Sequence, residues 1–168
     1  MDSTFSFCPK CGQPLVSGRE RLIDCKKCGF HLYLSPASTN ALILENERGE
    51  ILLTKRKLEP RIGYWDLPGG FVDFKETVEE SLIREIREEL GIKLKEIKYF
   101  GTYWSYYPYK GIRYQTLCHA YSAKYGNEKI KATDDVAEYR FFPRAEIPFG
   151  KLSFRDIESA LKDFLLVT

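Results

Sequence analysis

The chain has 168 residues, of which 43% are hydrophobic and 30% are charged, and its formal net charge is +2. Such a composition suits one core of ordinary size with a small appendage, and it excludes large multidomain architectures. The small net charge disfavours a protein whose main task is to coat nucleic acid. No apolar run is long enough to span a membrane, and the first residues lack the pattern of a secretory signal. We therefore expect a cytoplasmic protein without a membrane partner.

The first segment, residues 1–36, has too few aliphatic residues to build a core unaided. It contains two Cys-x2-Cys pairs, each followed by glycine, formed by Cys8, Cys11, Cys25 and Cys28. Four thiolates close a tetrahedral shell around zinc and leave no position for water. The spacing therefore predicts a zinc ribbon with structural Zn²⁺, in preference to a direct role in binding nucleic acid.

A second domain is expected over residues 37–168. Strand-like runs at 41–44 and 51–54 flank a polar turn and predict a hairpin. Further strands are expected at about 97–104, 113–123 and 139–142. A final amphipathic helix is expected from Ser153, with these residues turned inward: Phe154, Ile157, Leu161, Phe164 and Leu165.

A central helix is predicted between residues 77 and 91. Thr77, with Glu80 three residues later, forms a capping-box pattern, and Gly91 is a stop signal. Apolar residues recur between them at helical spacing and define a buried face: Leu82, Ile83, Ile86 and Leu90. Strands on both sides of this helix, followed by a second helix, indicate an α/β fold of the mixed sandwich type.

Three carboxylates gather on this helix, because Glu85, Glu88 and Glu89 lie at positions i, i+3 and i+4. Like charges so placed repel one another, and a divalent cation such as Mg²⁺ or Mn²⁺ would compensate. The alternative is a solvated face on which the glutamates pair with Arg84 and Arg87. The loop ahead of the helix favours the metal interpretation.

This loop and helix together match a known signature at nine positions across residues 70–92: Gly70, Glu76, Arg84, Glu85, Ile86, Glu88, Glu89, Gly91 and Ile92. The pattern resembles the box of the Nudix hydrolase family, and the preceding Gly-Tyr-Trp-Asp-Leu-Pro-Gly-Gly run, residues 63–70, looks like the family's lead-in. A match of this length is far more specific than an isolated glycine-rich motif.

The resemblance implies a Nudix α/β/α sandwich and an attack of water on one phosphorus of a substituted diphosphate. It implies that Glu85, Glu88 and Glu89 bind the catalytic Mg²⁺ or Mn²⁺, together with the backbone carbonyl of Gly70. By the same resemblance Arg84 orients the first of these glutamates, and Glu76 supports the geometry between loop and helix.

The general base stays open between two sources. One is a glutamate of the box, Glu88 or Glu89. The other is the later acidic segment at residues 133–138, in which we prefer Glu138 to its neighbours. The alternative for Glu138 is an acidic residue that caps a turn before the strand at 139–142.

Substrate contacts are expected from the aromatic-rich segment at residues 103–109 and from Arg56. Tyr103, Tyr106 and Tyr107 are candidates to stack on a base, and Arg56 is a candidate to contact phosphate. The alternative is that alternate rings of a strand pack into the core and that the arginine is solvated. The favoured substrate is a small-molecule nucleotide, namely ADP-ribose, a nucleotide sugar or a dinucleotide.

The order of ribbon and box resembles the bacterial NADH pyrophosphatases. Their Ser-Gln-Pro-Trp-like element is missing, because the corresponding segment reads Gly-Thr-Tyr-Trp-Ser-Tyr-Tyr-Pro-Tyr, and this puts NADH cleavage in doubt. Two alternatives remain: a hydrolase that removes nucleotide caps from RNA held by the ribbon, and a nucleotide-sensing regulator. Many Nudix relatives pair, so the resemblance also allows a homodimer.

Overall fold

The computed structural model describes residues 5–15, 21–131 and 136–167. The chain divides into two compact units, Met1–Pro36 and Ala37–Thr168. In the first unit, β1 (Leu22–Asp24) pairs antiparallel with β2 (His31–Tyr33). Within the described part of the chain, no helix has the length and apolar character needed to cross a membrane.

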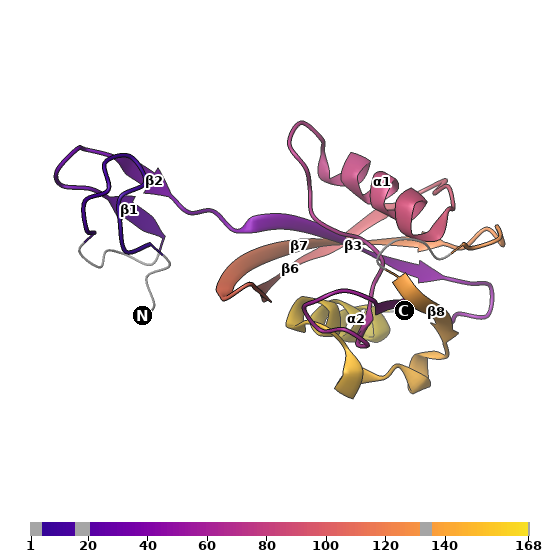
Figure 1. Ribbon diagram of the computed structural model, residues 1–168. Helices are drawn as coiled ribbons and strands as arrows, with labels where there is room; N and C mark the ends of the chain where they lie inside the picture. Colours follow the sequence, from indigo (N-terminus) through magenta and orange to yellow (C-terminus); the bar gives the residue numbers. More distant parts are fainter. Residues whose placement is uncertain (1–4, 16–20, 132–135, 168) are drawn as a thin grey trace. The chain divides into compact units, whose positions relative to one another are not determined.

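A six-stranded mixed sheet forms the centre of the second unit, in the order β5-β4-β3-β7-β6, with β8 paired to β4 (Figure 1). The neighbours β3 and β7 run parallel, and the other pairs run antiparallel. The strands are β3 (Ala37–Glu45), β4 (Ile51–Arg56), β5 (Trp65–Asp66), β6 (Lys98–Tyr109), β7 (Ile112–Lys124) and β8 (Val136–Phe142).

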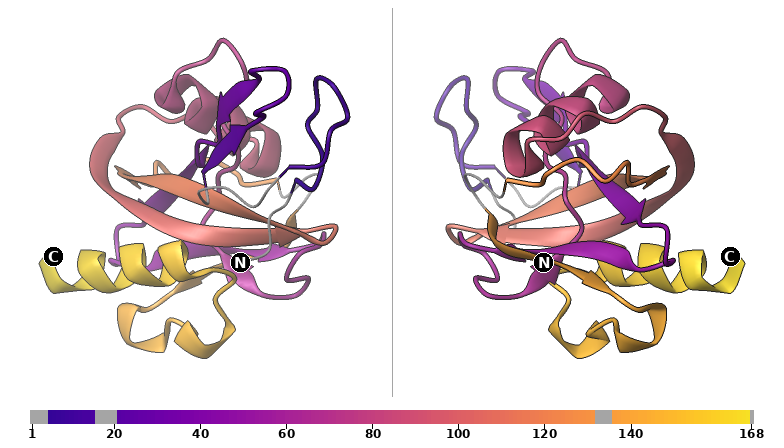
Figure 2. Two further views of the ribbon diagram at one scale, coloured as in Figure 1. Left: turned by 90° about the vertical axis from the view of Figure 1, so that its left-hand side faces the viewer. Right: turned by 90° about the vertical axis from the view of Figure 1, so that its right-hand side faces the viewer.

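Helices α1 (Val78–Leu90) and α2 (Arg155–Val167) cover opposite faces of this sheet (Figures 1 and 2). Strand alternation assigns the two packing layers, because successive residues of β3 point to opposite faces. Leu42 and Leu44 pack in the layer of α1, whereas Ala41 and Ile43 pack in the layer of α2. The predicted sandwich with a mixed sheet is confirmed.

The termini of α1 follow the sequence signals. Thr77 is the N-cap and forms a reciprocal capping box with Glu80, and Gly91 ends the helix in the left-handed region at φ 68°. The expected buried face is wrong at Ile83, whose exposed fraction is 47%. The fully buried Ser81 takes a place on that face, because its hydroxyl accepts a hydrogen bond from the Asn40 amide of β3 and donates one to the Phe71 carbonyl.

Strand β6 is longer than expected and includes the whole aromatic segment up to Tyr109. A tight turn at Lys110 and Gly111, both with positive φ, joins it to β7. Turns of this kind match the twist of paired strands. The aromatic rings therefore alternate between the two faces of a hairpin.

Candidate active site

Arg84 links the loop that precedes α1 to the glutamates of the helix. Its guanidinium donates to both carboxylate oxygens of Glu76, at 3.1 and 2.7 Å, and to Glu85 and Glu88 at 2.8 and 3.1 Å. Glu76 also accepts the backbone N–H of Asp73 at 2.7 Å. The hydrogen bonds from Arg84 and Asp73 lower the pKa of Glu76 to about 2. The ionised pair fixes the loop against the helix.

The glycine pair at the end of the loop is held from three sides. The N–H of Gly69 donates to Glu89 at 3.1 Å. The N–H of Gly70 donates to the Asn40 side chain at 3.2 Å, and its carbonyl accepts the Asn40 N–H at 2.8 Å. A Cβ at position 70 would lie 2.5 Å from the carboxyl carbon of Glu85. Glycine is therefore needed for this carboxylate to rest against the loop.

The two glycines predict different outcomes on substitution. Gly70→Ala should leave the free energy of unfolding within about 1 kcal/mol of wild type, since the group it meets is the end of a flexible side chain. It should lower activity at least about tenfold, because Glu85 must move. Gly69→Ala should destabilise by about 3 kcal/mol, because φ is 141° and the new Cβ lies 2.4 Å from the Asn40 carbonyl. Denaturant titration and kinetics on both variants test this; equal stability losses would contradict it.

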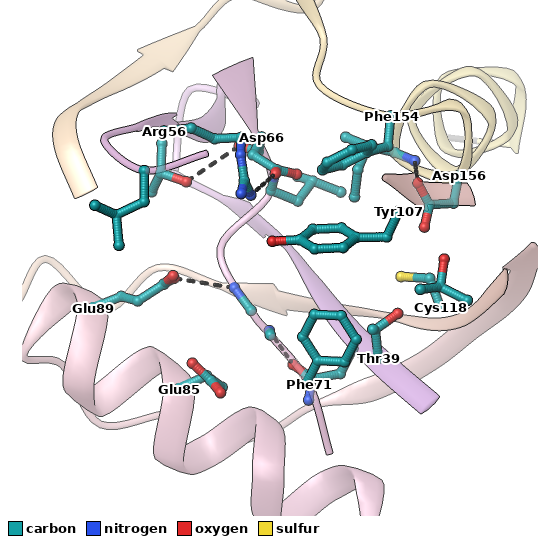
Figure 3. A pocket seen from close by; sticks show the side chains of 18 of the residues that line it. Thr39, Arg56, Asp66, Phe71, Glu85, Glu89, Tyr107, Cys118, Phe154 and Asp156 are labelled. Atoms are coloured by element: carbon teal, nitrogen blue, oxygen red, sulfur yellow. Dashed lines mark hydrogen bonds and ion pairs between the residues drawn. The ribbon is translucent and has the colours of Figure 1, made fainter. Parts of the chain in front are cut away.

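A pocket of about 400 Å³ lies between α1 and the start of α2. Figure 3 shows Glu85 and Glu89 of α1 on one side, with Arg56, Tyr107 and Phe154 on the other. The Arg56 guanidinium lies 5.2 Å from the centroid of the Phe154 ring and 6.0 Å from that of Tyr107. The pocket therefore joins an anionic wall to a cationic and aromatic wall.

Burial shapes the charges of this pocket. Desolvation raises the pKa of Glu85, against the lowering effect of Arg84. Arg56 donates to Asp66 at 3.0 Å and to the carbonyl of Pro60 at 2.8 Å. Burial raises the pKa of Asp66 even though Arg56 opposes the shift. These hydrogen bonds fix the guanidinium of Arg56. The two rings that it contacts, Tyr107 and Phe154, line the cavity.

The structure separates the residues expected to contact substrate. Tyr106 and Tyr107 line the pocket, as does Arg56. Tyr103 is not among the lining residues; its hydroxyl donates to Asp163 of α2 at 3.0 Å, because strand alternation and the packing of α2 turn it toward the helix. Tyr106 is 37% exposed and lies under the Arg113 guanidinium at 4.3 Å.

The two acidic candidates outside the pocket wall also have defined places. Glu88 is exposed and contacts Arg84, and it does not line the pocket. Glu138 lies inside β8, opposite Lys55, and pairs with it at 3.2 Å. The alternative, in which Glu138 caps a turn before the strand, is wrong, since β8 begins at Val136. Its neighbours Asp134 and Asp135 lie outside the described residues.

Some pocket residues carried no functional assignment from the sequence. Asp66 stands inside the lead-in of the box, Phe154 was expected to pack inward, and Asp156 had no expected role. The pattern gave no signal for the last of these, because it is the packing of α2 on β6 that buries it.

The oxygen donors at the α1 end suit a hard divalent cation. Glu85 and Glu89 line the same pocket as Gly70, whose carbonyl has a second lone pair beside the one used by Asn40. Glu88 accepts from the same Arg84 nitrogen as Glu85, at 3.1 Å and 2.8 Å respectively, but it does not line the pocket. The residues present therefore fit Mg²⁺ or Mn²⁺, with Glu85, Glu89 and Gly70 nearest the cavity.

The four cysteines of the first unit fit zinc more closely. Their sulfur atoms all lie within 4.8 Å of one another, and two Sγ–Sγ distances, from Cys8 to Cys28 and from Cys11 to Cys25, are 3.7 Å. A tetrahedron with Zn–S bonds of about 2.3 Å has edges of about 3.8 Å. Gly12 and Gly29, both with positive φ, donate to the carbonyls of Cys8 and Cys25 and close two equivalent turns.

Comparison with known proteins identifies a family model and relatives that match this chain. A model of the NUDIX domain matches residues 35–162. The chain is 39% identical to an ADP-ribose pyrophosphatase of Methanocaldococcus jannaschii, over 84% of this chain and 79% of that protein. It is 28% identical to the NAD-capped RNA hydrolase NudC of Pseudomonas putida, over 84% of this chain and 49% of that protein. The chain thus spans about half the length of the latter relative.

Solved structures show the same fold. A MutT NUDIX hydrolase from Burkholderia pseudomallei superposes with a TM-score of 0.68 at 29% identity, over 80% of this chain and 99% of that one. The NUDIX domain of NrtR from Shewanella oneidensis, complexed with ADP ribose, has a TM-score of 0.67 at 20% identity, over 81% of this chain and 91% of that one. The family match over residues 35–162 and the 39% identity to the Methanocaldococcus protein show that the chain belongs to the NUDIX family.

Proposed function

We propose that this chain hydrolyses the diphosphate of ADP-ribose, or of a related nucleoside diphosphate derivative, with a divalent cation bound at Glu85, Glu89 and Gly70. The observation that carries the proposal is one pocket that combines these oxygen donors with Arg56 and an aromatic wall. The 39% identity to an ADP-ribose pyrophosphatase supports the choice of substrate. Water adds to one phosphorus and a P–O–P bridge opens, giving AMP and ribose 5-phosphate.

In this proposal the residues around the pocket have different roles. When bound, Mg²⁺ would neutralise the diphosphate and lower the pKa of the attacking water. Arg84 keeps Glu85 oriented, and Glu76 keeps Arg84 in place, as their hydrogen bonds indicate. Arg56 faces the diphosphate from the opposite wall, since it is held by Asp66 and points its guanidinium along the aromatic rings.

For the general base we also propose Glu89, which would bind the cation through one carboxylate oxygen and take the proton of the attacking water on the other. It lines the pocket, and the N–H of Gly69 holds its carboxylate at 3.1 Å. Glu88 does not line the pocket, so it would join the cation only by turning toward Glu85 and Glu89. Glu138 is a weaker candidate, because it is exposed and already paired with Lys55.

The test is a substrate panel. The purified chain is incubated with Mg²⁺ and ADP-ribose, NADH, NAD⁺, diadenosine polyphosphates and nucleotide sugars, and released AMP and sugar phosphate are quantified. We expect ADP-ribose to give a kcat/KM at least about tenfold above the others, and EDTA to abolish turnover. Negligible, metal-independent rates on every compound would refute the proposal and favour a nucleotide-sensing role.

A second candidate is removal of a nucleotide cap from RNA, which the likeness to NudC proteins supports. In this case the ribbon, with the proposed Zn²⁺ at its four cysteines, would hold the strand. Salt-dependent binding of a capped oligonucleotide that is lost when residues 1–36 are altered would support it. Equal cleavage of free NAD⁺ and NAD-capped RNA would argue against a contribution from the strand.

A further inference from the structure

Asp156 is a buried carboxylate for which the proposed chemistry has no use. Its exposed fraction is 6%, and it lines the same pocket as Glu85 and Glu89. One of its oxygens accepts the N–H of Ile157 at 3.0 Å. Burial, helped by the nearby charge of Asp66, raises the pKa of Asp156 to about 6. At neutral pH it is mostly an anion held in a poorly solvated place.

No cation of the described residues forms an ion pair with this anion. Arg56 is committed to Asp66, and none of the ion pairs formed among the described residues involves Asp156. A carboxylate at the start of a helix gains some stability from the helix dipole, but an exposed position would give that gain without desolvation. The Ser105 hydroxyl and the backbone N–H groups of Asp156 and Ile157 also donate to this carboxylate. A carboxylate has about four acceptor positions, so one remains for a ligand in the cavity that the residue lines.

Aromatic rings flank this acceptor. The centroids of Tyr107 and Phe154 lie 5.3 Å apart, and Phe71 meets Tyr107 edge-on at 5.2 Å. Figure 3 shows these rings between Asp156 on one side and the glutamates of α1 on the other. Ring faces with one polar group beside them are the usual surroundings of a bound nucleobase.

The polarity of the site selects among bases. Asp156 as an anion accepts hydrogen bonds and donates none, so opposite position 6 of a purine it pairs with the amino group of adenine and repels the carbonyl oxygen of hypoxanthine. We propose that this end of the pocket is a nucleobase subsite in which Asp156 accepts a hydrogen bond from an amino group, so that the chain selects an aminopurine such as adenine over hypoxanthine. The inference rests on the proposed function for the position of the diphosphate.

A ribose hydroxyl could also donate to Asp156, and the test separates the two. The rings favour the base, because a planar base stacks on an aromatic face. The variant is Asp156→Asn, which keeps the shape and adds a donor. The matched control is Glu158→Gln, which removes a charge from a surface residue of the same helix that pairs with Lys162.

The measurement is the ratio of kcat/KM for ADP-ribose to that for inosine diphosphate ribose. We expect wild type and Glu158→Gln to prefer the adenine compound by about 10²-fold or more, and Asp156→Asn to reduce this ratio at least about tenfold. An unchanged ratio in Asp156→Asn would overturn the proposal. The proposal would also be overturned if Asp156→Asn changed the discrimination between ADP-ribose and its 2′-deoxyribose analogue but left the discrimination between the two bases unchanged.

Equilibrium binding of AMP and IMP, measured by calorimetry without added metal, keeps the two proposals apart. A preference for AMP that Asp156→Asn abolishes would support the base subsite even if ADP-ribose is not hydrolysed. Hydrolysis of ADP-ribose with no preference in either measurement would leave the proposed function intact and refute the subsite.

Discussion

Replacement of Glu89 by Gln should lower kcat for the cleaved diphosphate at least about 10²-fold, with a similar loss for Glu85→Gln. Both carboxylates line the pocket beside Gly70, and the amide removes the charge that a divalent cation requires. Kinetics at several Mg²⁺ concentrations measure the loss. If Glu85 and Glu89 bind the ion, the metal concentration for half-maximal rate should rise as kcat falls.

The control for this experiment is Glu96→Gln, an exposed glutamate beyond the end of α1. It should keep wild-type kinetics, and circular dichroism should show the same helix content in all the variants. Wild-type turnover in the double variant Glu85→Gln, Glu89→Gln would remove the basis of the metal assignment. The same series in Glu88→Gln shows whether that residue leaves Arg84 to join the site.

Cys25→Ser should abolish tight zinc binding and unfold the first unit. Structural zinc contributes about 10 kcal/mol or more of apparent binding free energy in small Cys-ligated domains, and this unit buries few apolar side chains of its own. Metal analysis should find one zinc per chain in wild type and far less in the variant. Amide spectra should lose dispersion for residues 1–36 and keep it for residues 37–168.

Cys118→Ala is the matched control, because this cysteine is buried in the layer of α2 and lies outside the ribbon. It should retain one zinc per chain. A Cys25→Ser protein that keeps its zinc and its amide dispersion would show that the four sulfur atoms do not form the site.

The sequence predicts the sandwich and the ends of α1 because their signals are local. The capping box of Thr77 and Glu80, the glycine stop and the apolar run at residues 41–44 of β3 depend on residues close together in the chain. The box residues likewise lie on one loop and one helix, so spacing alone brings Glu76 and Glu85 to Arg84.

The opposite wall of the pocket could not be predicted in this way. Phe154 and Asp156 reach the cavity only because α2 packs against β6, about fifty residues earlier in the sequence. Tyr103 and Tyr107 look alike in the sequence, yet one contacts Asp163 and the other lines the pocket. Such differences depend on how α2 packs against β6, and a single sequence carries no local signal for that packing.

The division of the core by the sheet has a consequence for how this protein can change over evolution. The helix with the box glutamates packs with Leu42 and Leu44, whereas α2 packs with Ala41 and Ile43 on the other face. Substitutions in α2 can therefore repack one layer while the other keeps its contacts. During evolution the residues of the α2 layer can thus change while the layer of α1, which carries the box glutamates, stays the same.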